Sequence, residues 1–227
     1  MLIYDVGMHN GEDTAYYLAK GARVVAIEAN PTLCEGVIQK FSLPISENRL
    51  TVLNLAVSEI DGEVEFFVND KNTLLSSITA TQNEFRRSIR IEARRLSGLF
   101  REYGQPDFVK IDIEGIDHKI VRDLRVSGCI PSQFSVEAHS FDVVNEILKT
   151  DHSKFRMVHG GQVARRFRSH SIKTMSGRAP FSFPNHSSGP FGEDLPDPWM
   201  NAEAMVSNWL LRRSLHGPGW YDIHAMK

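Results

Sequence analysis

The sequence predicts an α/β fold: a three-layer αβα domain around a mostly parallel sheet, with an irregular C-terminal cap. Three observations predict it. Short apolar segments of strand-like composition recur along the first two-thirds of the chain, helical segments of about ten residues separate them, and glycine or polar residues follow the strand candidates. This alternation is typical of right-handed βαβ units, whose strands run parallel.

The first three strands and the two helices between them are expected from composition and spacing. Each strand is a short, largely apolar run such as RVVAIE, and the second helix begins at an Asn-Pro pair, because proline suits a first helical turn. The strands cover residues 2–6, 23–28 and 50–55, and the helices cover residues 12–20 and 30–41.

Residues 56–70 are expected to form a β-hairpin, because an Asp-Gly turn signal at residues 61–62 precedes alternating apolar and polar side chains. A stretch rich in Ser and Thr follows at residues 73–81, and a second alternating segment covers residues 89–95. The strand–helix alternation then resumes, with helices expected at 96–103, 117–126 and 141–149 and strands at 107–113, 134–138 and 155–158.

Composition narrows the class of protein. The chain has 227 residues, 41% of them hydrophobic, and a net charge of −2, which excludes a disordered chain and speaks against a surface built to hold nucleic acid. It contains no apolar run of about 18 residues and no signal-peptide pattern, so we expect a cytoplasmic protein without a membrane partner. Cys34 and Cys129 lack the spacing of metal ligands.

Charge and loop-forming residues are unevenly distributed. The net charge is −6 over residues 1–150 and +4 over residues 151–227, and the second segment holds six of the ten prolines. We therefore place a ligand-binding core at residues 1–159 and a substrate cap or lid at residues 160–227 that completes the same domain. Within it, residues 186–199 combine turn residues with aromatics, as expected of a loop that closes over a pocket.

The loop after the first strand is the first candidate ligand site, because ligands of open parallel sheets bind at the carboxyl ends of the strands. It reads Asp5-Val-Gly7-Met-His-Asn10-Gly11-Glu-Asp-Thr14. Its glycines are spaced G-x-x-x-G. The next helix begins with two carboxylates, Glu12 and Asp13, which would repel a pyrophosphate at this helix N-terminus. They would tolerate a positively charged ligand without phosphate, such as S-adenosylmethionine. Asn10 is also expected to cap this helix.

A carboxylate ends the second strand. Glu28 lies 21 positions after Gly7, where α/β nucleotide folds accept hydrogen bonds from ribose hydroxyls. The residues next in line to flank a nucleoside are Ala29, Asn30, Ala56, Val57 and Ser58.

Three charges stand within five residues of an otherwise apolar strand candidate, DFVKIDI. Lys110, Asp112 and Glu114 fall on one face by the period-two rule, and a buried parallel strand normally excludes such residues. A self-satisfied Lys–Asp pair would explain them structurally. The functional interpretation places Asp112 and Glu114 in the cleft, one near a cationic cofactor and one near the acceptor.

Four segments in this order resemble one family: DVGMHNGEDT, VVAIEANP, LNLAVSEIDGEVEFF and DFVKIDIEGIDHKIV. The sequence is similar there, over about residues 1–138, to the FkbM-type methyltransferases. The resemblance implies a seven-stranded Rossmann-like sheet of class I methyltransferases and S-adenosylmethionine as cofactor, with S-adenosylhomocysteine as product. It also implies methylation of a hydroxyl oxygen of a sugar or secondary metabolite. The cofactor contacts it implies are Asp5, Gly7, Asn10, Gly11, Thr14, Glu28 and Asn30, with Asp112 near the methionine end.

Methyl transfer to an alcohol requires a base, and Asp112, Glu114 and His139 are the candidates, because all three follow strand ends on one rim. Asp112, Glu137 and His139 together form an alternative divalent-metal group, but no spacing is diagnostic and no metal is expected. Ser76 and Ser77 are candidates to approach the site. If the acceptor is anionic, its expected contacts are Arg86, Arg87, Arg90, Arg94, Arg95, Arg165, Arg166 and Arg168.

A small hydroxylated acceptor is the expected partner, without nucleic acid, and a homodimer is left open. The alternatives are a nucleic-acid or protein methyltransferase, which would use the positive tail, and a nicotinamide-dependent oxidoreductase of the same fold class. The oxidoreductase would require G-x-G-x-x-G, which this loop lacks.

Overall fold

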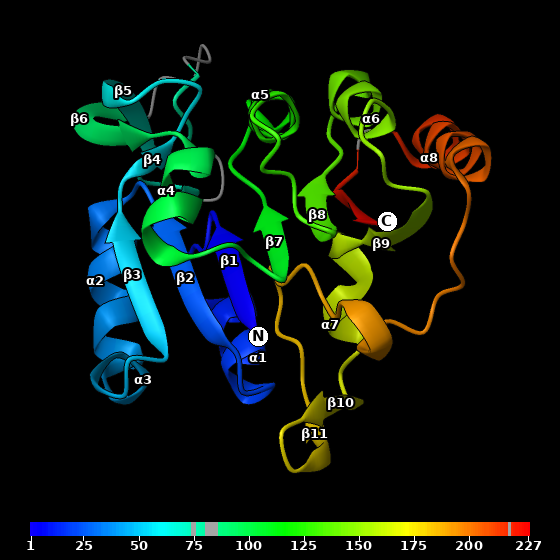
Figure 1. The fold of residues 1–227 in the computed structure, drawn as a ribbon, viewed down its shortest axis with the longest axis horizontal. Coiled ribbons are helices and arrows are strands. Elements are labelled where there is room, and N and C mark those ends of the chain that lie inside the picture. The colour runs from blue at the N-terminus through cyan, green and yellow to red at the C-terminus, as the bar shows by residue number, and fades with distance from the viewer. Residues whose placement is uncertain (74–75, 80–85, 218) are drawn as a thin grey trace.

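The computed structural model describes residues 1–73, 76–79, 86–217 and 219–227. A seven-stranded sheet crosses this part of the chain in the order β3-β2-β1-β7-β8-β12-β9 (Figure 1). All its strands are parallel except β12, which is antiparallel to both neighbours. The strands are β1 (Leu2–Val6), β2 (Arg23–Glu28), β3 (Leu50–Asn54), β7 (Phe108–Ile111), β8 (Gln133–Glu137), β9 (Lys154–His159) and β12 (Tyr221–Met226). The predicted mostly parallel sheet is confirmed.

Helices cover both faces of the sheet, which gives the three predicted layers. Adjacent residues of β1 point to opposite faces: Ile3 packs with α1 and α2, whereas Tyr4 packs with α4. One face carries α1 (Glu12–Ala19), α2 (Pro31–Lys40) and α7 (Val163–Arg166), and the other carries α4 (Leu96–Tyr103), α5 (Asp117–Val126), α6 (Phe141–Leu148) and α8 (Ala202–His216). Burial on both faces explains why these strands are apolar without alternation.

The strand order reverses beside β1. This strand pairs with β2 on one side and with β7 on the other, with Asp5 opposite Lys110. The loops that follow β1 and β7 therefore leave the sheet in different directions. A crevice forms outside the carboxyl ends of strands at such a switch point, and this is where the fold positions a ligand.

The predicted hairpin at residues 56–70 is wrong. A separate small sheet has the order β4-β6-β5, in which β5 (Gly62–Asn69) pairs antiparallel with β6 (Arg86–Arg94) along its whole length. β4 (Ala56–Val57) pairs parallel with β6 instead. β4 has only two residues and could form few hydrogen bonds with β5, whereas β6 is about as long as β5 and pairs with all of it. Part of the stretch at residues 73–81 lies outside the described residues.

The C-terminal segment is more regular than the sequence predicts. It contains a hairpin of β10 (His170–Thr174) and β11 (Gly177–Phe181), the long helix α8, and two short 3-10 turns at Gly160–Gln162 and Gly192–Asp194. The short helix α3 (Ser42–Ser46), whose residues are all at least partly exposed, was also not predicted. β12 lies between β8 and β9 in the sheet. The predicted boundary between the core at residues 1–159 and the cap at residues 160–227 therefore divides strands of a single sheet.

The segment predicted as a lid is fastened to α1. The carboxylate of Asp13 accepts hydrogen bonds from the Ser187 hydroxyl (2.5 Å) and from the Ser188 backbone N–H (3.0 Å). Phe191 stacks on Phe108 of β7, with ring centroids 4.0 Å apart. The segment is thus part of the packed core on this face. No helix in the described ranges is both long and apolar enough to cross a membrane.

Replacing Phe191 with alanine should test this attachment. Both Phe191 and Phe108 are buried, so Phe191→Ala leaves a cavity in the core, and we expect it to lower the free energy of unfolding by about 3 kcal/mol. Urea unfolding measures this change. The control Leu215→Ala removes an exposed side chain of α8 and should change it by less than about 0.5 kcal/mol. Equal effects of the two substitutions would contradict the packing described here.

Candidate active site

Two loops approach each other closely at the crevice. Gly7, directly after β1, has φ of 79°, a region that side chains rarely adopt. A Cβ on Gly7 would lie 1.8 Å from the carbonyl oxygen of Asp112, which follows β7 directly. The backbone conformation and the neighbouring loop therefore both require glycine at this position.

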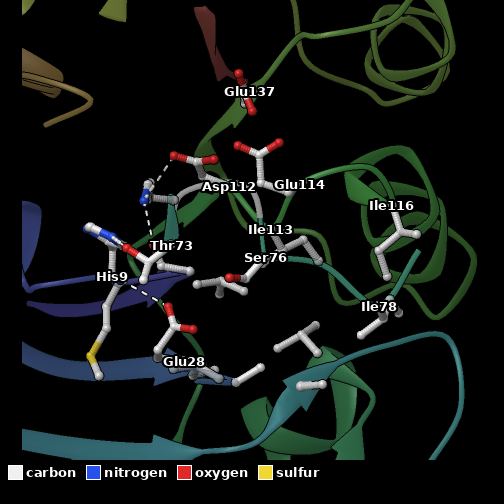
Figure 2. Close-up of a pocket in the computed structure, with 18 of the residues that line it drawn as sticks. His9, Glu28, Thr73, Ser76, Ile78, Asp112, Ile113, Glu114, Ile116 and Glu137 are labelled. Atoms are coloured by element: carbon white, nitrogen blue, oxygen red, sulfur yellow. Dashed lines mark hydrogen bonds and ion pairs between the residues drawn. The ribbon is translucent and has the colours of Figure 1, made fainter. Parts of the chain in front are cut away.

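A cavity of about 250 Å³ opens at these loops. Figure 2 shows Glu28 on one side of it and Asp112, Glu114 and Glu137 on the other. The side near Glu28 is largely apolar, formed by Ile27, Ala29, Leu55, Val57 and Phe66. The predicted site residues that line the cavity are Gly7, Glu28, Ala29, Ala56, Val57, Asp112 and Glu114. The sequence therefore located both halves of one pocket.

Glu28 is held by two backbone groups. Its carboxylate accepts hydrogen bonds from the N–H of His9 (3.1 Å) and from the N–H of Asn30 (2.8 Å). Burial raises the pKa of Glu28 against the lowering effect of these two hydrogen bonds. The carboxylate is thus fixed in direction at the edge of the apolar wall, where it can accept further hydrogen bonds.

Lys110 joins the two loops beneath the pocket. Its ammonium donates to the carbonyl oxygen of Gly7 (2.9 Å) and lies 3.3 Å from Asp112 Oδ2, 3.7 Å from Asp5 and 3.8 Å from Asp13. Burial opposes its charge, but the carboxylates of Asp112, Asp5 and Asp13 hold the pKa of Lys110 above its usual range. Lys110 therefore remains a cation at the floor of the site.

Asp5 and Thr14 support the loop without lining the cavity. The Thr14 hydroxyl donates to Asp5 Oδ2 at 2.5 Å, and both residues are fully buried. Burial, despite the attraction of Lys110, raises the pKa of Asp5 to about 6. Asp5 and Thr14 were predicted to contact the cofactor. In the structure they instead connect β1 to α1 beneath the pocket.

Four other predicted cofactor residues do not line the cavity. The predicted cap at Asn10 is wrong: Gly11, with φ of 74°, takes the N-cap position of α1 without a side-chain hydrogen bond, and Asn10 is exposed. Asn30 caps α2 by accepting from Thr32 N at 3.1 Å. The Ser58 N–H donates to the Arg94 carbonyl oxygen (3.0 Å).

The strand expected at residues 107–113 ends earlier than predicted. β7 stops at Ile111, because Glu114 adopts φ of 55° and the Asp117 carboxylate accepts two backbone N–H groups of the loop. Lys110 stays in the strand, whereas Asp112 and Glu114 project from the loop. This turn brings both carboxylates to the cavity.

Glu137, at the end of β8, joins them. Each of Asp112, Glu114 and Glu137 has an oxygen within 4.8 Å of the others. His139 does not line the cavity, and its Nδ1 lies 3.6 Å from Asp117 Oδ2. The structure therefore does not bring the predicted base His139, or the alternative metal group with His139, to the pocket.

Several lining residues were not singled out from the sequence: Met8, His9, Asn72, Thr73, Ile78, Ile113 and Ile116. His9 stands inside the predicted glycine loop, so its position was a usable signal, and its Nε2 lies 2.8 Å from the Thr73 hydroxyl. Ser76, a sequence candidate, also lines the cavity. Two residues of the tail also line the cavity: His186, the first residue of the segment predicted as a lid, and Trp220, for which the sequence left a pocket or a subunit contact open.

Comparison with solved structures gives distant likenesses. The precorrin-6Y C5,15-methyltransferase of Geobacter metallireducens is 14% identical, with a TM-score of 0.44 and coverage of 100% of this chain and 79% of that chain. A SAM-dependent O-methyltransferase of Thermotoga maritima is 10% identical (TM-score 0.44; 100% and 58%). The 1,6-didemethyltoxoflavin N1-methyltransferase of Burkholderia thailandensis is 14% identical (TM-score 0.37; 100% and 70%). No curated protein matches the sequence significantly.

A family model gives the stronger finding. The model of the FkbM methyltransferase domain matches residues 5–157, from the end of β1 into β9. This range includes Glu28, Asp112 and Glu137, and it covers more than half of the chain. The chain therefore belongs to the FkbM methyltransferase family, whose methyl donor is S-adenosylmethionine.

Proposed function

We propose that this pocket binds S-adenosylmethionine and directs its methyl group to a hydroxyl oxygen of a small molecule, such as a sugar or a secondary metabolite. One observation carries the proposal: a single cavity joins an apolar wall ending in Glu28 to a group of carboxylates beside Gly7. The family match supports methyl transfer, and the oxygen target is part of the proposal.

The residues present fit this cofactor. Glu28 offers a fixed carboxylate to ribose hydroxyls, and the neighbouring apolar wall suits a flat purine. Glu12 and Asp13, at the start of α1, make the helix N-terminus unsuitable for a pyrophosphate. The pocket therefore favours a nucleoside with positive charge over a dinucleotide, which argues against the nicotinamide-dependent alternative.

When bound, S-adenosylmethionine supplies an electrophilic methyl group on a sulfonium, open to in-line displacement. The chain must align the acceptor and remove its hydroxyl proton. Asp112 is placed for this, because it lies at the junction between the Gly7 loop and the other carboxylates, and Lys110 orients its Oδ2. In this proposal the other oxygen of Asp112 accepts the proton, and Glu114 helps to position the acceptor.

Glu28→Gln should weaken cofactor binding. It replaces a charged acceptor by an amide, and the loss of a charge-assisted hydrogen bond corresponds to a roughly tenfold to hundredfold higher Kd. Calorimetric titration with S-adenosylhomocysteine measures this change. Glu35→Gln, an exposed residue of α2, is the matched control and should leave the Kd unchanged. Equal affinities of all three proteins would refute the assignment of Glu28.

Asp112→Asn should reduce turnover more than binding. Loss of the general base is expected to lower kcat by about a hundredfold or more, while the Kd for S-adenosylhomocysteine rises by less than about tenfold. The measurement needs a methyl-accepting substrate, found by screening hydroxylated metabolites for S-adenosylhomocysteine formation. A variant with unchanged kcat would exclude Asp112 as the base.

Glu137→Gln should make the ligand-free protein more stable at alkaline pH. Burial, with repulsion by Asp112 and Glu114, raises the pKa of Glu137 to about 11. Between its unfolded value of about 4.3 and this value, the folded protein retains a proton that the unfolded chain has released, so stability falls as pH rises. Thermal unfolding should show a higher midpoint for Glu137→Gln near pH 8, with the difference shrinking toward pH 4. A constant difference across this range would contradict the raised pKa.

A further inference from the structure

Acidic side chains dominate the ionisable lining of the pocket. Six carboxyl groups line it, from Glu12, Asp13, Glu28, Asp112, Glu114 and Glu137. Lys110 is the one lysine among the described lining residues, which include no arginine, and its ammonium already faces Asp5, Asp13 and Asp112. Glu28 and Glu12 belong to the cofactor side, which leaves Glu114 and Glu137 beside the proposed base.

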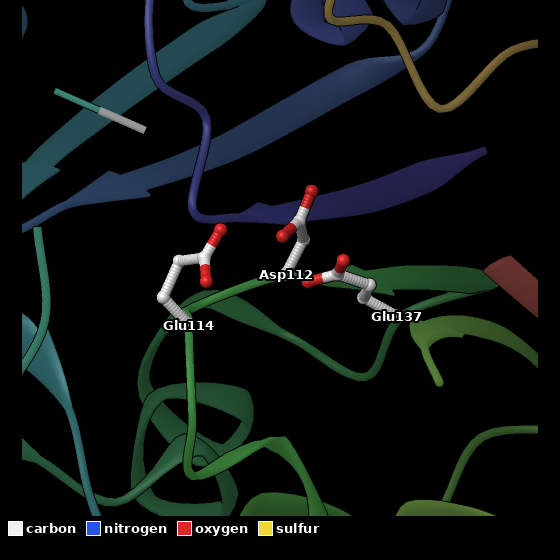
Figure 3. Close-up of side chains that lie close together, drawn as sticks. All are labelled: Asp112, Glu114 and Glu137. Atoms are coloured by element: carbon white, nitrogen blue, oxygen red, sulfur yellow. The ribbon is translucent and has the colours of Figure 1, made fainter. Parts of the chain in front are cut away.

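Glu137 carries an independent indication of a missing partner. The residue is only 9% exposed, and its Oε2 has no hydrogen-bond partner within the described part of the chain. Figure 3 shows the Glu137 carboxyl group directed toward Asp112, with Glu114 on the far side. A buried carboxyl oxygen without a donor is costly, so a donor supplied by a ligand would be favourable there.

The distance between Glu114 and Glu137 suits a primary ammonium. Two acceptors of one ammonium, each about 2.8 Å from the nitrogen in tetrahedral directions, lie about 4.6 Å apart. Asp112, Glu114 and Glu137 each offer one oxygen, and these three oxygens lie within 4.8 Å of one another. An ammonium held by Glu114 and Glu137 would therefore lie beside Asp112, whose Oδ2 is 3.3 Å from the Lys110 ammonium.

An anionic acceptor has no counter-charge here. No arginine is among the described residues that line the cavity. Three of the eight arginines that the sequence offers for phosphate or carboxylate are paired elsewhere: Arg94 with Glu102 at 3.0 Å, Arg95 with Asp123, and Arg166 with Asp197 at 2.9 Å. A neutral polyol offers no counter-charge to Asp112 and Glu114. A positive charge on the acceptor would offer one, and it would also favour the ionised form of Glu137.

We propose that the acceptor carries a primary ammonium group next to the hydroxyl that is methylated, and that Glu114 and Glu137 bind this ammonium. The acceptor class is therefore an amino alcohol or amino sugar. The inference rests on the proposed function, since it assumes that the hydroxyl lies beside Asp112. Glu114 and Glu137 then act in specificity: they select the acceptor by charge and place its hydroxyl against the base.

Three sugar probes of equal ring size and different charge test the inference: the methyl glycosides of glucosamine, glucose and glucuronic acid. Each is titrated into the full chain with saturating S-adenosylhomocysteine and a chelator, and binding is followed by ligand-observed NMR. We expect the glucosamine derivative to bind at least about tenfold more tightly than the glucose derivative, and the glucuronic acid derivative to bind most weakly. Because S-adenosylhomocysteine already occupies the cofactor site, a tighter binding of the glucosamine derivative cannot come from its ammonium taking the place of the cofactor's ammonium.

The double variant Glu114→Gln/Glu137→Gln should reduce the glucosamine-to-glucose ratio to about one, without changing the Kd for S-adenosylhomocysteine. Its control is Glu59→Gln/Glu63→Gln, which removes the same charge from exposed positions and should keep the ratio. The single variant Glu114→Gln, on a loop, gives a partial loss should the double variant not fold.

Equal binding of the charged and neutral probes, no binding of the glucosamine derivative, or a preference that survives the double variant would each overturn the inference. A preference that appears only after Mg²⁺ replaces the chelator would overturn it in favour of a metal site. Failure of the proposed function is a separate result: S-adenosylhomocysteine would then not bind by calorimetry, while the charge ranking of the probes could still be measured without it.

Discussion

A buried lysine surrounded by carboxylates is the interaction on which the site depends. Lys110 stands in the central strand β7, opposite Asp5 of β1, and its ammonium reaches the Gly7 carbonyl oxygen and Asp112. An ion pair at this depth is stable only when each charge keeps partners, because desolvation is expensive. The lysine therefore ties together the two loops of the crevice, and through Asp13 it also touches the serines of the C-terminal segment.

The two halves of the pocket are built by different means. The half beside Glu28 is made of strand ends and backbone N–H groups, which the parallel sheet brings together by its topology alone. The carboxylate half depends on a left-handed turn at Glu114, on the end of β8 and on tail residues such as Trp220. The first half follows from the arrangement of strand ends in nucleoside-binding α/β sheets, whereas the second half depends on individual loop and tail side chains.

Most of the sheet could be predicted because buried parallel strands and their helices have strong local patterns. β1, β2 and α5 agree with the expected ranges to within a residue. The predicted hairpin at residues 56–70 was wrong because a turn signal does not say which strands will pair. β12 was missed because its neighbours in the sheet are distant in sequence. Glu28 and Asp112 were found from strand ends. His139 does not line the cavity, because it lies beyond the end of β8 and its Nδ1 lies 3.6 Å from Asp117 Oδ2.

The position of β12 has a consequence for how the protein forms during synthesis. β8 and β9 leave the ribosome with a gap between them that only residues 221–226 can fill, so β9 has no neighbour in the sheet until then. The strands around β1 can assemble earlier, since domains fold from the N-terminal side as the chain emerges. In the nascent chain, the nucleoside half of the pocket would thus precede the half that contains Glu137, and the exposed edges of β8 and β9 would be open to chaperones or to mispairing in the interval.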